Sequence, residues 1–211
     1  MNEQNIIDKY IRPLSKNFEE SFSLQDDAAL LKNFKNNNIV VSRDNFIYGV
    51  HCPEWLNIKY AVTRAILIAV SDLYAMASKP YCILLSLTLP KKVNKYFLGN
   101  LKKGISKALK LTGTNLAGGD ICSHTGAISI CVSAIGTVNK KHILRRNGAK
   151  AGDLLCVTGN IGDAKIGLDL MLHRKISVNK YSKNYFTKKF IFPDVKYNIA
   201  KSLCKYITSC I

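Results

Sequence analysis

The sequence predicts a fold of the α+β or α/β class, in which strands and helices alternate at short spacing along 211 residues. Two observations carry this prediction. Short apolar runs of strand length, such as residues 39–42 and 82–89, are separated by longer segments with apolar residues at helical spacing, such as 57–77 and 93–111. The hydrophobic fraction of 47% can supply a real core, and no internal repeat suggests a solenoid.

The spacing of apolar residues predicts each helix and strand, and prolines and capping residues predict where it ends. Residues 3–12 have apolar residues at helical spacing and precede Pro13; Asn57 can cap a long helix that Pro80 stops. Residues 174–192 are rich in Lys, Asn, Ser and Tyr and are expected to form an irregular loop. The expected strands are 39–42, 82–89, 114–117, 127–138 and 153–159, and the expected helices are 3–12, 57–77, 93–111, 162–173 and 195–207.

A domain boundary is expected near residues 138–150, where the composition turns basic and glycines at 148 and 152 break the pattern. This divides the chain into an N-terminal domain, 1–138, and a second part, 139–211. The second part is too small to bury a good core alone. Either the chain is a fragment, or its tail packs on the first domain.

Charge and cysteines limit the class of protein. The formal net charge is +17, but the lysines are scattered and not clustered with arginines and aromatics, so we expect no nucleic-acid partner. The seven cysteines are odd in number and contain no C-x-x-C spacing, which indicates reduced thiols in a cytoplasmic protein. The N-terminus has no apolar signal segment, and Arg64 and Asp72 interrupt the longest apolar run, so no membrane partner is expected.

Several of the 14 acidic residues lie beside strongly apolar segments. In an α/β domain, residues just past strand ends gather at one edge of the sheet, and carboxylates gathered there need cations, for which Mg²⁺ is the natural choice. Each acid also has a structural interpretation as a turn, a cap, or, for Asp72, an ion pair with Arg64. As a set they predict a metal site; they are Asp26, Asp27, Asp44, Asp72 and Asp120.

Other catalytic motifs are missing. The sequence has no G-x-x-x-x-G-K-[ST] phosphate loop, no kinase-type His-Arg-Asp loop and no G-x-S-x-G elbow. We therefore expect no side chain to act as catalytic acid, base or nucleophile. His51, near Asp44, is either structural or a ligand contact, and Arg145 and Arg146 are either phosphate-binding or solvated.

Several motifs together resemble the thiamine-monophosphate kinases of the aminoimidazole-ribonucleotide-synthetase-like superfamily, over most of the chain. They are Gln25 to Leu31, Ser42-Arg43-Asp44 with Gly49-Val50-His51, Ser71 to Met76, Gly118-Gly119-Asp120, and Arg146 to Asp153 with Val157-Thr158-Gly159.

The resemblance implies a mixed sheet packed by helices, the start of a second α/β domain that is incomplete at residue 211, and a homodimer formed by the N-terminal domain. It also implies that ATP phosphorylates thiamine monophosphate to thiamine diphosphate with Mg²⁺. His51 would lie in the thiamine-phosphate site, and Gly119, Asp120 and Arg146 would contact ATP. The Mg²⁺ positions implied are Asp27, Ser42, Arg43, Asp44, Asp72 and Asp120.

Two alternatives stay open. Arg43 stands where the family has a hydroxyl, and Ala69 where it has an asparagine, so the chain could be a non-catalytic family member. It could also be a sister enzyme that uses ATP and Mg²⁺ on another acceptor.

Overall fold

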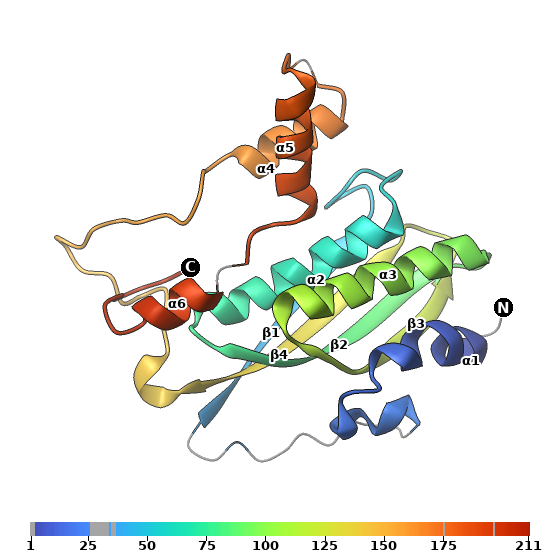
Figure 1. Cartoon of the computed structure of the whole chain (residues 1–211), viewed down its shortest axis with the longest axis horizontal. Helices are drawn as coiled ribbons and strands as arrows, with labels where there is room; N and C mark the ends of the chain where they lie inside the picture. The colour runs from blue at the N-terminus through green and yellow to red at the C-terminus, as the bar shows by residue number, and fades with distance from the viewer. Residues whose placement is uncertain (1–2, 26–33, 35–36, 175, 196) are drawn as a thin grey trace.

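One four-stranded sheet organises the fold (Figure 1). The computed structural model describes residues 3–25, 34, 37–174, 176–195 and 197–211. The strand order is β1-β4-β2-β3, with β4 antiparallel to both neighbours and β2 parallel to β3. This mixed sheet confirms the predicted α+β class. The strands are β1 (Asn37–Ile47), β2 (Lys79–Pro90), β3 (Asn115–His124) and β4 (Ser129–Asn139).

Two long helices lie side by side over one face of the sheet, α2 (Ile58–Ala75) and α3 (Lys95–Thr112) (Figure 1). Asn57 caps α2 as predicted, because its side chain accepts a hydrogen bond from the Lys59 N–H at 2.9 Å. Apolar residues of α2, α3 and the sheet form one buried cluster. Its largest fully buried members include Ile66, Leu73, Ile83, Leu98, Leu101 and Ile105.

The end of α2 differs from the prediction. The helix ends at Ala75, and Ala77 takes a left-handed conformation with φ of 54°. Pro80 is the second residue of β2 and precedes an irregularity in the pairing with β4. The helix therefore stops before the proline, which is tolerated at the start of the strand.

The N-terminal segment is helical as expected, although not as one α-helix. It contains α1 (Glu3–Ile6), a π-helical turn η1 (Ile7–Ile11), and the 3₁₀ segments η2 (Arg12–Leu14) and η3 (Glu19–Leu24). Pro13 lies in the first turn of η2, where its missing N–H does no harm.

The second part contains three helices and a 3₁₀ turn within its described residues: η4 (Lys140–His142), α4 (Asp163–Met171), α5 (Lys180–Ile191) and α6 (Tyr197–Leu203). The α4 prediction is confirmed, α6 is shorter than expected, and the irregular loop predicted for 174–192 is wrong. The side chain of Asn179 caps α5 by accepting from the Ser182 N–H at 2.8 Å. Since Phe190 and Ile191 of α5 join the main core, the tail packs on the first domain.

Arg64 of α2 contacts α5 directly. Its Nη1 donates to the Phe190 carbonyl oxygen, and its guanidinium carbon lies 4.1 Å from the centre of the Phe190 ring. Burial lowers the pKa of Arg64 to about 10, which leaves the group charged at neutral pH. Arg64 thus anchors the C-terminal end of α5, where carbonyl groups favour a cation, and the alternative of an ion pair with Asp72 is wrong.

The strand predicted for 153–159 is also wrong. Leu154 and Leu155 are 91% and 98% exposed, and residues 153–160 have no regular secondary structure. A strand needs a neighbouring strand for its backbone hydrogen bonds, and none of the described strands pairs with this segment. Residues with a high preference for strands were therefore not sufficient to form a strand at 153–159.

Among the described residues, no helix has the length and apolar character needed to cross a membrane. All seven cysteines lie in described segments and are free, but only Cys52, Cys82 and Cys131 are buried, so the expectation of packed thiols holds for these three alone.

Candidate active site

A side-chain cluster forms where the last turn of α2 meets β1. Ser42 of β1 donates a hydrogen bond of 2.5 Å from its Oγ to Oδ2 of Asp72 in α2. The two residues are thirty positions apart in sequence. Strand alternation directs Ser42 to the face that the helices cover, together with the buried Val40 and Phe46. The register of β1 under α2 therefore creates this contact.

Asp44 belongs to the same cluster. It lies two residues after Ser42 on the same face of β1. Burial raises the pKa of Asp44, the nearby Asp72 carboxylate raises it further, and His51 lowers it in part. Asp72 also lies in the last turn of α2, where the helix carbonyl groups already create a negative potential. Two carboxylates and a helix C-terminus thus create a local negative potential that favours a cation, although the protein as a whole is very basic.

His51 completes the cluster. Its Nδ1 accepts a hydrogen bond of 3.0 Å from the Ile47 N–H, and its ring stacks on Phe46 with centroids 5.6 Å apart. A neutral imidazole that accepts at Nδ1 carries its proton on Nε2. His51 is exposed, so this Nε2–H is a fixed donor for an anionic ligand.

The donor set fits Mg²⁺. A hydroxyl and two carboxylates are hard oxygen ligands, and Mg²⁺ is typically held by one or two carboxylates together with water and phosphate oxygens. The pKa of Asp44 is raised first by burial and second by the Asp72 carboxylate, and a bound cation would offset both. Ser42, Asp44 and Asp72 are the residues that would hold it.

We predict that Asp44→Asn stabilises the metal-free protein. The substitution removes one of two repelling carboxylates, so the melting temperature in EDTA should rise by about 1–3 °C, a shift kept small because the site is partly solvated. Added Mg²⁺ should raise the melting temperature of the wild type and not of Asp44→Asn. If Asp44→Asn melts at a lower temperature than the wild type, both in EDTA, the prediction is wrong and the Asp44 carboxylate makes a stabilising contact.

Asp120 and Gly119 lie elsewhere in the sheet. We predicted that these residues and Asp44 follow strand ends, but all three lie inside strands, and β1 and β3 are opposite edges of the sheet. Three strand spacings separate them, about 14 Å. Asp120 pairs with Ser86 and is exposed on the face away from α2 and α3.

Gly119 has a packing role. A Cβ at this position would overlap the Leu85 carbonyl oxygen of β2. The glycine therefore allows the close approach of two neighbouring strands.

Arg43 also points away from the cluster. It lies between Ser42 and Asp44, so alternation places it on the open face of the sheet, and it is exposed there opposite Ser133. The structure does not bring Arg43 to the other predicted metal positions. Asp27, like Asp26, lies outside the described residues.

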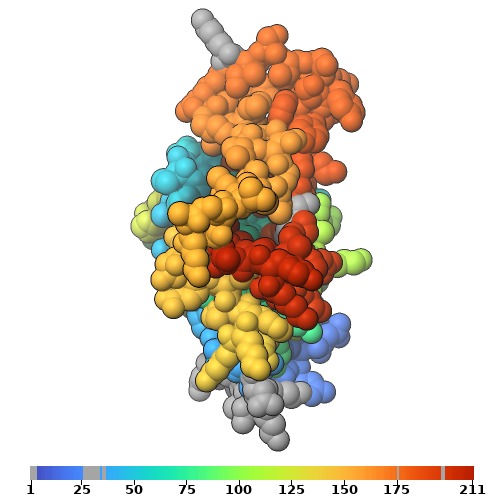
Figure 2. Space-filling model, turned by 90° about the vertical axis from the view of Figure 1, so that its left-hand side faces the viewer, coloured from blue at the N-terminus to red at the C-terminus, as the bar shows by residue number. Residues whose placement is uncertain are grey.

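The backbone at Arg146 lies at the same end of α2 as Asp72. The Leu144 N–H donates to the Met76 carbonyl oxygen at 3.5 Å, just past the helix. The Ser209 Oγ donates to the carbonyl oxygens of Arg145 and Arg146, at 2.9 and 2.7 Å. Figure 2 shows this C-terminal segment, in red, lying against the yellow and orange segment that carries the two arginines. The C-terminal residues therefore hold the Arg146 backbone in place.

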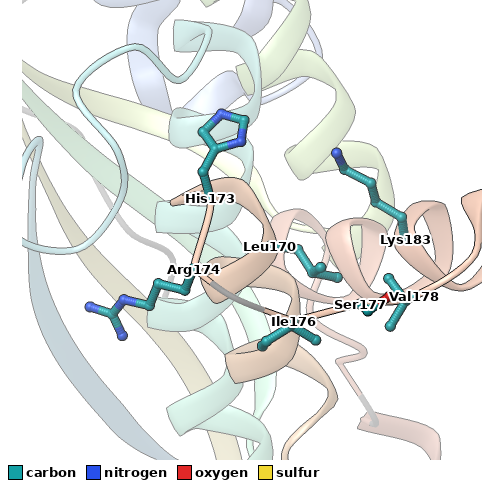
Figure 3. A pocket seen from close by; sticks show the side chains of 7 residues that line it. All are labelled: Leu170, His173, Arg174, Ile176, Ser177, Val178 and Lys183. Atoms are coloured by element: carbon teal, nitrogen blue, oxygen red, sulfur yellow. The ribbon is translucent and has the colours of Figure 1, made fainter.

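A shallow pocket of about 340 Å³ lies apart from this cluster, between α4 and α5 (Figure 3). Leu170, Ile176 and Val178 line it, together with Lys183. Arg174 also borders it, but its Nη1 is paired with Asp169 at 2.7 Å. None of the residues predicted from sequence lines this pocket.

Comparison with known proteins identifies the family of the chain. Residues 25–138 match the model of the AIR synthase related protein, N-terminal domain. Over 193 residues the chain is 35% identical to a thiamine-monophosphate kinase of Buchnera aphidicola subsp. Schizaphis graminum, with 91% of this chain and 59% of that relative covered.

Two solved structures have the same fold. The thiamine-monophosphate kinase from Stenotrophomonas maltophilia K279a has a TM-score of 0.78 at 26% identity, covering 88% of this chain and 59% of that one. AaThiL complexed with AMPPCP and TMP has a TM-score of 0.75 at 25% identity, covering 87% and 58%. Ser42, Asp44, His51 and Asp72 all lie within the matched residues 25–138. The chain therefore belongs to the AIR synthase related protein family, and the candidate site lies in the N-terminal domain that defines the match.

Proposed function

We propose that the protein transfers the γ-phosphoryl group of ATP to thiamine monophosphate and produces thiamine diphosphate, in the cytoplasm. The observation that supports the proposal is the cluster of Ser42, Asp44, Asp72 and His51, in which two carboxylates and a hydroxyl that would hold a cation lie near a donor that would bind an anion. The thiamine-monophosphate kinases at 25% identity and above support the reaction. Since the chain spans only 59% of the length of the Buchnera relative, the activity is a proposal for the protein that contains it.

The chain's own residues have distinct roles in this reaction. Mg²⁺, when bound, would neutralise phosphate charge during transfer. Asp44 and Asp72 supply the negative charge that holds it, and Ser42 orients the Asp72 carboxylate through the 2.5 Å hydrogen bond. His51 directs its Nε2–H toward the phosphate of the acceptor. An acceptor that is itself a phosphate needs little base catalysis, which agrees with the lack of a general base in the proposal.

Gly119, Asp120 and Arg146 remain the proposed ATP contacts, and Asp120 a further metal ligand. Asp120 and Arg43 are exposed on the open face of the sheet, so they would act on a ligand bound there or between two subunits. Asp27 is proposed as a metal ligand from the sequence motif alone.

The direct test is to incubate the purified chain with ATP, Mg²⁺ and thiamine monophosphate and to measure thiamine diphosphate by chromatography. Mg²⁺-dependent ATP binding is measured in parallel by calorimetry. Product formation supports the proposal. ATP binding without product favours the non-catalytic alternative, and product formed only from another acceptor favours a sister enzyme. Loss of both activities contradicts the site assignment.

One observation favours the alternative that the chain by itself is not catalytic. Leu154 and Leu155 are exposed in a segment that pairs with none of the described strands, which supports the proposal that residues 139–211 need a further polypeptide segment to cover them. Mixing the chain with a polypeptide that corresponds to the remaining part of a longer relative would restore activity if this is the cause.

A second copy of the chain is the proposed partner of the sheet face opposite α2 and α3, in the part that Phe18 of the N-terminal segment leaves uncovered. Ile39 and Val41 of β1 are 54% and 63% exposed, and Leu84 of β2 is 37% exposed on the same face. Apolar groups on an open sheet face gain from burial against another subunit. We predict a dimer by analytical ultracentrifugation and at least tenfold weaker association for Val41→Lys. Leu111→Lys, an exposed change on α3, should have no effect, and a monomeric wild type would contradict the proposal.

A further inference from the structure

Three lysines from three helices gather around a pair of aromatic rings. Lys59 lies in the first turn of α2, Lys107 in α3, and Lys188 in the last turn of α5. The Lys107 Nζ lies 3.6 Å from the centre of the Phe192 ring, and the Lys59 Nζ lies 5.5 Å from the centre of the Tyr60 ring. The two rings meet edge to face with centroids 5.9 Å apart. We call these five residues the lysine cluster; helix packing brings together lysines that are scattered in the sequence.

The backbone beneath the lysine cluster is held in place. A Cβ at Gly104, three residues before Lys107, would overlap the Lys59 carbonyl oxygen, so the backbones of α2 and α3 are in close contact there. The Phe192 N–H donates to the Lys188 carbonyl oxygen at 2.8 Å, which connects the third lysine to the ring. Contact with an aromatic face restricts an ammonium group on a flexible side chain. Two of the three charges are therefore positioned in advance, which lowers the entropic cost of binding a ligand.

The positive charge of the lysine cluster is not neutralised by ion pairs. None of the ion pairs between described residues includes these three lysines. Asp194, the acid closest in sequence to Lys188, is paired with Lys189 at 2.6 Å. Partial burial lowers the pKa of Lys107, and the charges of Lys59 and Lys188 lower it further. Like charges that repel one another favour the binding of an anion, because the anion reduces their repulsion.

We propose that the lysine cluster binds a short condensed phosphate, an anion whose several negative charges lie close together. Lysine ammonium groups bind phosphate as point charges, and three of them match a di- or triphosphate better than a singly charged carboxylate. The lysine cluster is separate from the candidate active site, because Lys59 and Asp72 are thirteen residues apart on α2, about 20 Å along the helix. Binding at this position is therefore additional to the phosphoryl transfer proposed above.

Calorimetric titration with inorganic tripolyphosphate in EDTA tests the proposal. Without Mg²⁺, the carboxylates of Asp44 and Asp72 should repel this anion, so the lysine cluster is tested alone. We expect tripolyphosphate to bind the wild type, at least about tenfold more weakly when the salt concentration is raised from about 20 to about 200 mM. Orthophosphate, which carries fewer charges, should bind at least about tenfold more weakly than tripolyphosphate. Equal affinity for the two anions, or no binding at low salt, would overturn the proposal.

Charge-removing variants locate the binding. Lys59→Met, Lys107→Met and Lys188→Met should each weaken tripolyphosphate binding about five- to tenfold at low salt, whereas Lys107→Arg should keep it within about twofold. Lys95→Met is the matched control, since it removes the same charge from the exposed start of α3, about 18 Å along the helix from Lys107. If Lys95→Met weakens binding as much as Lys107→Met, only the net charge matters and the lysine cluster is not a site.

Two further results would assign the anion differently. Binding that is lost in Arg146→Gln and retained in Lys107→Met would place it at the proposed ATP contact. A single-stranded oligonucleotide that competes with tripolyphosphate and binds more tightly per phosphate would show that the lysines bind a nucleic-acid backbone. Either result would overturn the assignment to a condensed phosphate. Tripolyphosphate binding that depends on all three lysines would support the site, whether or not the chain forms thiamine diphosphate.

Discussion

Asp72→Asn is expected to lower thiamine diphosphate formation by about 10²- to 10³-fold, the size of effect seen when one charge-stabilising group is removed from an active site. The amide oxygen can still accept the Ser42 hydrogen bond, so the local geometry should survive while the charge that holds a cation is lost. Stability should change little or rise slightly, because a carboxylate in the last turn of a helix is unfavourable.

Turnover, melting temperature and Mg²⁺-dependent ATP binding should be measured together. Asp8→Asn is the matched control, since Asp8 lies on the N-terminal helical segment, where it pairs with Arg12 and accepts a hydrogen bond from Gln4. If the wild type shows no turnover, the binding measurement carries the test. Wild-type ATP and Mg²⁺ binding in Asp72→Asn would show that the cluster is not the metal site. Asp120→Asn in the same assays will establish whether the opposite edge of the sheet acts in the reaction.

Gly104→Ala is expected to destabilise the protein by about 2 kcal/mol and to lower the melting temperature by about 4–8 °C. Gly104 lies where α3 packs against α2. A Cβ there would overlap the Lys59 carbonyl oxygen and lie 2.5 Å from Val62 Cγ1. The Thr63 Oγ1 also donates to the Gly104 carbonyl oxygen at 3.0 Å. Because two helix backbones would have to move apart, the loss should exceed the gain in helix propensity.

Gly99→Ala, in the same helix, is the control. No atom lies within 4 Å of a Cβ at Gly99, so the substitution should stabilise α3 by about 0.5–1 kcal/mol. Chemical denaturation of both variants gives the comparison. Equal effects at the two positions would show that the contact between α2 and α3 is looser than these distances indicate.

Local patterns were sufficient for the long elements of the N-terminal domain. The helices α2 and α3 were predicted to within two residues at each end from helical periodicity, and the caps Asn57 and Asn94 lie at their starts. Each has a face that packs on the sheet, so the period of the sequence and the tertiary packing agree.

Prediction failed where local preference and tertiary contact disagree. The many lysine, serine and tyrosine residues of α5 predicted a loop. The segment is a helix because Phe190 and Ile191 pack in the core and Arg64 donates a hydrogen bond to the Phe190 carbonyl oxygen. Residues 153–159 have strand-forming side chains and find no neighbouring strand among the described ones.

The site shows the same division. Acids beside apolar segments were the sequence signal for Asp44 and Asp72, and in the structure Asp44 is half-buried whereas Asp72 is exposed. Their arrangement depends on strand order, which places Asp44 on β1 and Asp120 on β3 at opposite edges.

The sequence by itself determined the fold class, the main helices and the family, because periodicity, capping and residue chemistry are local properties; of the acids it selected, Asp44 has a raised pKa. Only the tertiary structure decided which of those acids meet. Ser42 and Asp72 are thirty residues apart, and their 2.5 Å contact exists because β1 pairs with β4 in one register and α2 crosses above it. Strand order and register depend on long-range pairing, which a single sequence does not display.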